Sequence, residues 1–334
     1  MQSFQFERAS DAAQAIRAGA ASRTAQQGAQ VRFVAGGTTL IDLMKLDVER
    51  PTQVVDINRL PGLDQVERQA DGSLRIGALV RNADLARDPH VERDYPVLSQ
   101  ALLSGASAQL RNMATTSGNL LQRTRCMYFR DTAMACNKRE PGSGCSAIGG
   151  ANRMLAILGT SDHCIASNPS DMNVALSALG ASIVVRNQQG ERQIGIDDFY
   201  LLPGDTPERE TVLEPGDLIT HVLLPAPQAG ARSMYLKLRD RASYEFALSS
   251  AAVVVSLDGG HIREARVALG GVGTKPWHAR AAEQALRGAK ADDASFLAAA
   301  QAELAQARPQ SQNGFKVELA KRCLVHALRT VTRA

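Results

Sequence analysis

A buried strand gives way to a helix at the stretch Phe33-Val34-Ala35-Gly36-Gly37-Thr38-Thr39-Leu40, through a tight Gly-Gly turn. A turn of this kind leaves backbone N–H groups free at the start of the helix, where they favour an anion. Because Gly36 and Gly37 have no Cβ, a phosphate could approach the backbone closely. An ordinary strand–helix turn has the same pattern, and the glycine spacing is not G-x-G-x-x-G, so the stretch does not predict a Rossmann fold.

A second loop of small polar residues has the sequence Thr115-Thr116-Ser117-Gly118-Asn119. Hydroxyl groups and a glycine placed together can line a phosphate or a ribityl chain, and they also occur in plain turns. Taken alone, the residues of this loop favour the plain turn.

Four of the five cysteines lie in a loop-rich segment between this second loop and Ser170-Asp171. The segment contains Pro141-Gly142-Ser143-Gly144 and has no long apolar period, so it cannot bury much core by itself. A long irregular segment in a folded chain usually has a function or is held together by internal crosslinks. The residues that could form such crosslinks are Cys126, Cys136, Cys145 and Cys164.

Disulfides, zinc, an iron–sulfur cluster and free thiols are all open at this point. Structural zinc sites usually draw their ligands in close pairs, which are absent here. Disulfides need an oxidising compartment, and Met1–Glu7 lacks the apolar core of a signal peptide. A cluster tolerates irregular spacing, and the excess of basic over acidic residues between Leu120 and Ser170 favours thiolates. The fifth cysteine, Cys323, lies in a helical pattern and is predicted to be a buried thiol.

The composition is that of an ordinary globular protein. The 334 residues are 44% hydrophobic and 22% charged, with a net charge of +4, and they are enough for two or three domains. Dispersed basic residues and only 4% aromatic residues argue against a nucleic-acid partner, and no apolar run is long enough for a membrane span. The sequence has no H-E-x-x-H and no G-x-S-x-G motif, so no catalytic residue is predicted and the chemistry is expected to be carried by cofactors.

Two domains are predicted, 1–227 and 228–334, divided at Pro225-Ala226-Pro227. Short strands and helices share the first domain. In the second, a strand and a hairpin around Asp258-Gly259-Gly260 precede three helices, which predicts a small antiparallel sheet plus helices. The expected strands cover 234–239, 251–257 and 262–269, and the expected helices cover 278–286, 291–305 and 315–331.

Several stretches, in this order along the chain, resemble the FAD-binding subunits of the xanthine dehydrogenase family. Each stretch alone is unspecific, but the combination is specific. The stretches are Phe33–Leu40, Arg111–Asn119, Ser170-Asp171 and Tyr235–Arg241.

The resemblance implies an α+β fold with a PCMH-type FAD-binding domain of two α/β subdomains over 1–227. A domain like the C-terminal domain of CO dehydrogenase flavoproteins follows over 228–334. The two glycine loops are then expected to embrace the FAD pyrophosphate, with Asp171 holding FAD from the other side. Ser117 departs from the family, which usually has the first glycine of a Gly-Gly-Asn there. The residues implied for FAD are Phe33, Val34, Ala35, Gly36, Gly37, Thr38, Thr39, Leu40, Thr115, Thr116, Ser117, Gly118, Asn119, Asp171 and Lys237.

The cysteine segment, at about 120–170, resembles an insertion next to the flavin. Most family members pass from the second loop to the acidic residue in a much shorter stretch. The strings Arg123–Arg130 and Cys136–Cys145 resemble the flavin subunits of periplasmic aldehyde oxidoreductases, which are three-chain molybdenum enzymes whose insertion carries a 4Fe–4S cluster. Flavin subunits of 4-hydroxybenzoyl-CoA reductases have a cluster insertion with a less similar cysteine spacing. The implied cluster ligands are Cys126, Cys136, Cys145 and Cys164.

The resemblance implies an electron-transfer subunit of a heterotrimer. It would take electrons from a 2Fe–2S subunit and a molybdopterin-binding catalytic subunit, where aldehydes become carboxylates, and pass them to an external acceptor. A flavin subunit of a 4-hydroxybenzoyl-CoA-reductase-like or xanthine-dehydrogenase-like enzyme is the alternative within the family. A hypothesis from another class is a zinc-stabilised nucleotide-binding scaffold without redox chemistry. The expected compartment is the cytoplasm, or the periplasm after co-export with a partner that carries the signal.

Overall fold

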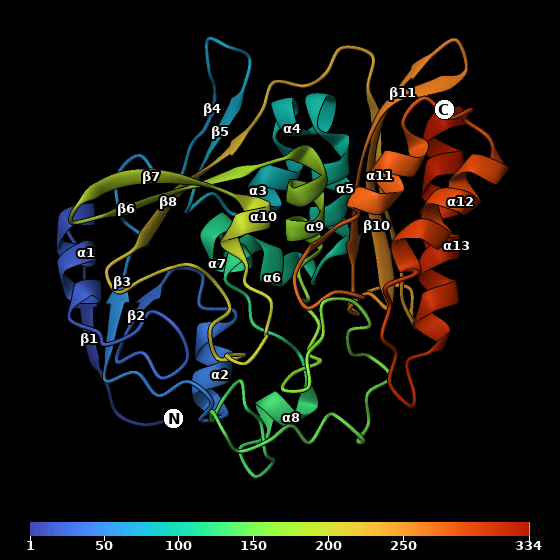
Figure 1. The fold of residues 1–334 in the computed structure, drawn as a ribbon. Coiled ribbons are helices and arrows are strands. Elements are labelled where there is room, and N and C mark those ends of the chain that lie inside the picture. The colour runs from blue at the N-terminus through green and yellow to red at the C-terminus, as the bar shows by residue number, and fades with distance from the viewer. Residues whose placement is uncertain (334) are drawn as a thin grey trace.

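Three sheets, each covered by helices, make up the computed structural model, which describes residues 1–333 (Figure 1). The first is a parallel sheet in the order β1-β3-β2, and it forms the N-terminal subdomain with two helices. The apolar strands pack on the inner face of the first helix through Ala15 and Ile16, which are buried. Its elements are β1 (Gln5–Arg8), α1 (Ala12–Ala20), β2 (Val31–Val34), α2 (Leu40–Lys45) and β3 (Gln53–Asp56).

The second sheet is antiparallel, in the order β4-β5-β8-β6-β7, and it buries one face under a group of short helices. Its strands are β4 (Val66–Arg68), β5 (Leu74–Gly77), β6 (Ser182–Asn187), β7 (Gly190–Gly195) and β8 (Leu218–Leu224). Its helices are α3 (Asn82–Arg87), α4 (Pro89–Asp94), α5 (Pro96–Ser104), α6 (Ala108–Met113), α7 (Thr116–Leu120), α9 (Asp171–Leu179) and α10 (Ile196–Phe199).

Helix α9 carries one of the predicted site residues at its first position, so its start matters for the site. The hydroxyl of Ser170 accepts a hydrogen bond from the backbone N–H of Asn173 at 3.1 Å, which caps the helix. The helix ends at Gly180, whose φ of 65° is left-handed. These two signals fix Asp171 in the first turn of the helix.

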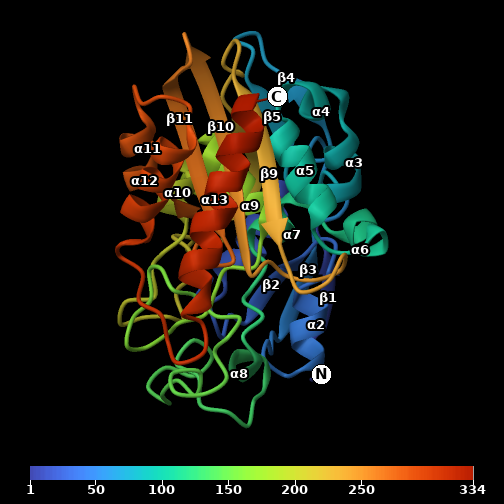
Figure 2. The same ribbon diagram turned by 90° about the vertical axis from the view of Figure 1, so that its right-hand side faces the viewer.

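The third sheet is antiparallel, in the order β12-β11-β10-β9, and belongs to the C-terminal part of the chain. Helix α13 lies across one face of this sheet, while α5 and α9 contact the sheet from the second subdomain (Figure 2). Cys323 on α13 is 1% exposed in this core, as predicted. The elements are β9 (Arg232–Leu238), β10 (Ser249–Asp258), β11 (His261–Gly270), β12 (Trp277–His278), α11 (Arg280–Leu286), α12 (Asp293–Leu304) and α13 (Phe315–Arg333).

The cysteine segment runs between α7 and α9 and contains one short helix, α8 (Met127–Arg130). In Figure 1 it forms the green loops below α2. It does have a small core, in which Phe129 and Leu155 pack with cysteines against Leu43 and Val48 of the N-terminal subdomain. That core is partly made of thiols, which is why apolar periodicity did not indicate it.

Lys316 of α13 holds the end of the cysteine segment against the C-terminal domain. Its ammonium group is fully buried and donates to the carbonyl oxygens of Met154, Leu155 and Gly271 at 3.2, 3.0 and 2.6 Å. Burial lowers the pKa of Lys316 to about 7, and the three carbonyl oxygens are what keeps a cation tolerable there. Among residues 1–333, no helix combines the length and the apolar character that crossing a bilayer requires.

Candidate functional site

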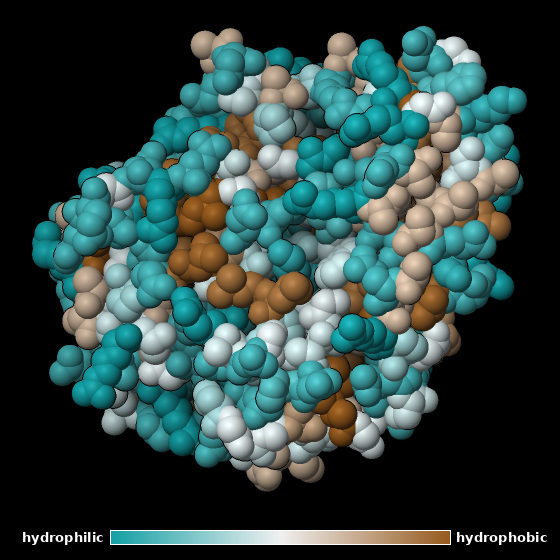
Figure 3. All heavy atoms as spheres, viewed as in Figure 1, coloured by the Kyte–Doolittle hydropathy of each residue, from teal (hydrophilic) through white to brown (hydrophobic). Residues whose placement is uncertain are grey.

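Two cavities of about 230 Å³ each meet at the two glycine loops. The Phe33 cavity lies between the N-terminal subdomain and the second sheet, and Figure 3 shows a hollow with apolar side chains on that face. The Lys237 cavity lies between α5, α6 and the loop after β9. Thr38, Thr39 and Gly118 line both cavities, so a ligand could run from one into the other past these residues.

The first glycine loop offers free backbone donors. Within residues 1–333, the N–H groups from Gly36 to Leu40 donate to no protein acceptor, and Thr39, the N-cap residue of α2, makes no side-chain cap. Gly37 has a left-handed φ of 74°, which favours glycine. Consecutive unpaired N–H groups at a helix start suit the two negative phosphates of a dinucleotide.

Gly36 also serves a contact within the protein, in addition to lining the Phe33 cavity. A Cβ at this position would lie 1.9 Å from the carbonyl oxygen of Met113, so the missing side chain lets the two loops touch each other. The close approach that needs this glycine is therefore a contact within the protein.

Most backbone donors of the second loop are already paired within the protein. The N–H groups of Thr116 and Ser117 donate to the carbonyl oxygens of Val80 and Ala78, and the N–H of Gly118 donates to the hydroxyl of Thr115. The loop can contribute side chains instead. The amide oxygen of Asn119 accepts from the Ser170 hydroxyl at 2.8 Å, which turns this side chain toward the start of α9.

The structure brings nearly all residues predicted for FAD to the walls of these two cavities. Thr116 is the exception, because it is 1% exposed, lines neither cavity and donates its hydroxyl hydrogen to the carbonyl oxygen of Val80. The Phe33 cavity is lined by Phe33, Val34, Ala35, Gly36, Gly37, Thr38, Thr39, Leu40, Thr115, Ser117 and Gly118. The Lys237 cavity is lined by Thr38, Thr39, Gly118, Asn119, Asp171 and Lys237.

Asp171 and Lys237 form an ion pair in the wall of the Lys237 cavity. The ammonium group lies 2.8 Å from the carboxylate, with side-chain exposures of 4% for Lys237 and 9% for Asp171. Lys237 also donates to the carbonyl oxygen of Ser104 at 3.1 Å, and Tyr235 donates its phenol hydrogen to Asp171. Tyr235 was not predicted, although its position two residues before Lys237 on β9 puts both side chains on one face of the strand.

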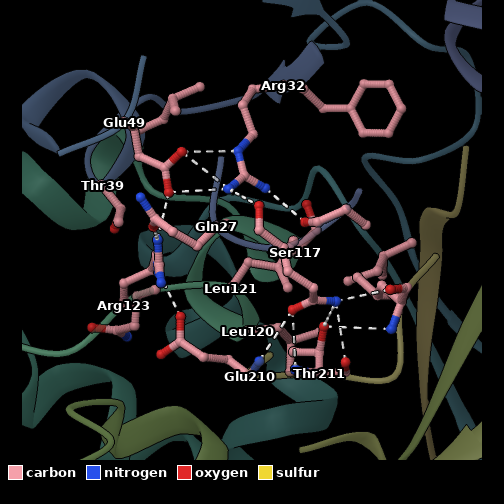
Figure 4. Close-up of a pocket in the computed structure, with 18 of the residues that line it drawn as sticks. Gln27, Arg32, Thr39, Glu49, Ser117, Leu120, Leu121, Arg123, Glu210 and Thr211 are labelled. Atoms are coloured by element: carbon pink, nitrogen blue, oxygen red, sulfur yellow. Dashed lines mark hydrogen bonds and ion pairs between the residues drawn. The ribbon is translucent and has the colours of Figure 1, made fainter. Parts of the chain in front are cut away.

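An ionic network that the sequence did not predict forms part of the Phe33 cavity (Figure 4). Arg123 lies between Glu49 and Glu210, and Glu49 also pairs with Arg32 at 3.0 Å. Lys138 pairs with Glu210 at 3.1 Å. Burial alone would raise the pKa of Glu210, but Arg123 and Lys138 outweigh it and lower that pKa to about 2. The network ties the cysteine segment to the N-terminal subdomain and to the loop before β8.

The four cysteines of the segment line one small cavity, the cysteine cavity, together with Phe129, Lys138 and Ala166. All five cysteines of the chain are free thiols. Burial raises the pKa of Cys126 to about 11 and also raises that of Cys164, which Lys138 partly offsets. Cys164, Lys138 and Ala166 line the Phe33 cavity as well, so the two cavities share a wall.

The donor set of the cysteine cavity consists of four thiols. Among residues 1–333, no three His, Cys, Asp or Glu side chains are close enough together to hold one ion. Tetrahedral zinc with bonds of about 2.3 Å needs sulfur atoms about 3.8 Å apart. A cubane cluster binds each thiolate through a different iron, so its ligands stand farther apart. Four thiols around one enclosed space match the number and type of ligands that a 4Fe–4S cluster takes.

Comparison with known proteins identifies the family. The chain is 50% identical over 330 residues to the aldehyde oxidoreductase FAD-binding subunit PaoB of Escherichia coli, covering 98% of both chains. The family model described as the FAD binding domain in molybdopterin dehydrogenase matches residues 2–227. The chain belongs to the FAD-binding subunits of the xanthine dehydrogenase family. The family model of the CO dehydrogenase flavoprotein C-terminal domain matches residues 234–331 of this FAD-binding subunit.

Other relatives of the FAD-binding subunit agree with this family. The glyceraldehyde dehydrogenase medium chain of Sulfolobus acidocaldarius is 29% identical over 262 residues, 78% of this chain and 75% of its own. A chain of carbon monoxide dehydrogenase from Hydrogenophaga pseudoflava has the same fold, with a TM-score of 0.76 at 24% identity, covering 99% of this chain and 97% of that one. The expected fold class is confirmed, and so is the expectation that the chain is a subunit of a molybdenum hydroxylase-family oxidoreductase.

Proposed function

We propose that this chain is the FAD- and 4Fe–4S-binding electron-transfer subunit of a molybdenum-containing aldehyde oxidoreductase, which oxidises aldehydes to carboxylates. The observation that carries the proposal is the shared wall between a cleft suited to a dinucleotide and a cavity lined by four thiols. The name of the relative with 50% identity supports the aldehyde as the substrate class.

The chain's partners are proposed to be a 2Fe–2S subunit and a molybdopterin-binding catalytic subunit in a heterotrimer, with an external electron acceptor. The complex would work in the cytoplasm, or in the periplasm after co-export with a partner that carries the signal.

FAD would bind with its pyrophosphate at the free N–H groups of the first glycine loop. Its redox ring would lie in the Lys237 cavity, because a buried cation stabilises the negative charge that the ring gains on reduction. The adenosine end would then lie in the Phe33 cavity, between Phe33 and the second sheet. FAD supplies the exchange between one-electron carriers and a two-electron acceptor.

The cluster would be held by Cys126, Cys136, Cys145 and Cys164, which line one cavity. Lys138 lies beside Cys164, where its positive charge lowers the cost of a thiolate. The cluster would replace the protons of buried thiols, so the segment's small thiol-rich core would be completed by iron and sulfide.

Single Cys→Ser variants test the ligand set. Iron and sulfide per chain and the visible spectrum are measured for each purified complex. We expect each of the four segment variants to lose iron and sulfide, because every ligand holds its own iron. Cys323→Ser is the matched control, since Cys323 is also a buried thiol but lies in the C-terminal core, and it should keep both. If the wild type contains zinc and no sulfide, the cluster proposal is wrong and the zinc alternative holds. If only Cys323→Ser loses the cluster, the proposed ligand set is wrong.

A further inference from the structure

Asp171 has both carboxylate oxygens engaged by neighbours on β9. One oxygen accepts the ammonium hydrogen of Lys237 at 2.8 Å, and the other accepts the phenol hydrogen of Tyr235. Tyr235 is 6% exposed and Asp171 8% exposed, so water cannot substitute for either partner easily. The three side chains form a fixed chain of charge-assisted hydrogen bonds that ends at the Lys237 cavity.

The Lys237 side chain is only 4% exposed at the wall of this cavity. Arg125, Arg241 and Glu245 also line the cavity, and their side chains are 32%, 59% and 27% exposed. Arg111 lines it too, and its guanidinium group donates to the carbonyl oxygen of Gly105 at 2.7 Å. Water and ions screen the exposed charges far more than the buried one. The field inside the cavity therefore depends strongly on how much of the Lys237 charge is neutralised by Asp171.

We infer that Tyr235 is a positioning residue that sets the midpoint potential of the flavin through Asp171 and Lys237. This inference rests on the proposed location of the flavin ring in the Lys237 cavity. The phenol hydrogen carries a partial positive charge toward Asp171 and takes up part of its negative charge, which leaves more of the Lys237 charge uncompensated. A reduced ring carries negative charge, so this arrangement favours the reduced flavin.

Tyr235 keeps its proton under all ordinary conditions. Burial raises the pKa of its phenol well above the usual value, and the negative charge of Asp171 raises it further. The phenol is therefore a permanent donor to the carboxylate, and its effect on Lys237 does not switch off with pH.

A double-mutant cycle on the FAD-loaded complex tests the inference. The variants are Tyr235→Phe, Asp171→Asn and the double variant, with redox titration of the flavin absorption as the readout. Tyr235→Phe should lower the midpoint potential, since Asp171 then neutralises Lys237 more fully. Asp171→Asn should raise it, because the ammonium charge loses its counter-ion. In the Asp171→Asn background, adding Tyr235→Phe should change the potential little, because the phenol then faces a neutral amide.

Tyr95→Phe is the matched control, because Tyr95 is also buried and donates to a single carbonyl oxygen, that of Pro225, but lines neither cavity. The flavin midpoint potential of the Tyr95→Phe complex should equal that of the wild type. A shift in Asp171→Asn without a shift in Tyr235→Phe would overturn the inference and leave the ring's location standing. Flavin-loaded variants that show no shift at all would overturn the location of the ring. Loss of FAD from Tyr235→Phe but not from Tyr95→Phe would show that the hydroxyl serves binding, and would also overturn the inference.

Discussion

At the scale of single residues, Gly36 shows how a position that lines a cavity can also hold two loops together. The two glycine loops pass so close to each other that no side chain fits between Gly36 and the carbonyl oxygen of Met113. The free N–H groups of the first loop and the side chains of the second are aligned by this contact. Any group added at Gly36 must push the loops apart.

Gly36→Ala should therefore reduce bound FAD strongly while leaving most of the fold intact. A Cβ only 1.9 Å from a backbone oxygen cannot be relieved by turning a side chain, so the loops must separate. Flavin per chain after purification measures the loss. Gly314→Ala is the control, because nothing lies within 4 Å of a Cβ there and its φ is not left-handed. Full flavin content in Gly36→Ala would contradict the proposed alignment of the loops.

The sequence could predict that glycines were needed here, but not the reason for Gly36. The turn pattern at residues 36 and 37 indicates backbone approach, whereas the partner in that approach is Met113, far along the chain. A contact of that kind depends on tertiary packing, which local patterns do not contain. The same holds for Tyr235, whose role depends on Asp171 being brought beside β9.

At the scale of elements, the cysteine segment is held by ion pairs as much as by its core. Arg123 precedes its first cysteine and Lys138 follows its second, and both reach Glu210 in the loop before β8. The excess of positive charge in the segment is visible in the sequence, where we interpreted it only as support for the thiolates. The acidic partners Glu49 and Glu210 lie outside the segment and became visible only in the folded chain.

Glu210→Gln should loosen the segment. Removing the carboxylate leaves Arg123 and Lys138 short of a counter-ion, which costs on the order of 2 kcal/mol for a pair whose carboxylate is 27% exposed. Thermal unfolding and the rate of limited proteolysis between 120 and 170 measure the effect. Glu318→Gln is the control, since Glu318 and Arg322 form an exposed pair on α13 that contributes little. Equal stability of the two variants would refute the role of the network.

At the scale of the whole molecule, His278 connects the second subdomain to the C-terminal domain. It lies on β12 and pairs with Asp197 of α10 through one ring nitrogen and with Glu283 of α11 through the other. Burial would lower the pKa of His278, but the two carboxylates outweigh it and raise that pKa to about 9. The charged imidazole therefore contributes to the contact between the domains.

The stabilisation that His278 contributes should fall as the pH rises through about 9. A histidine with a raised pKa gives its full stabilisation below the unfolded value of 6.5 and loses it above the folded value, up to about 3 kcal/mol in this case. The lowered pKa of Lys316 makes its own contribution to stability rise with pH, opposite to that of His278. The quantity to compare is therefore the difference in unfolding free energy between wild type and His278→Gln, in which the effect of Lys316 cancels. That difference in unfolding free energy should shrink between pH 7 and 10. A constant difference would contradict the ion pairs.

The wall formed by Lys138, Cys164 and Ala166 faces the cysteines on one side and the Phe33 cavity on the other. A ligand that orders this wall from one side reduces the entropy cost of binding a second ligand on the other side. Thermodynamic linkage makes the gain in affinity the same for both ligands. If the cysteines hold a cluster as proposed, the bound cluster raises the affinity for flavin by a certain factor. Bound flavin then raises the affinity for the cluster by the same factor. Iron supply would then change the share of chains that retain a vitamin-derived cofactor.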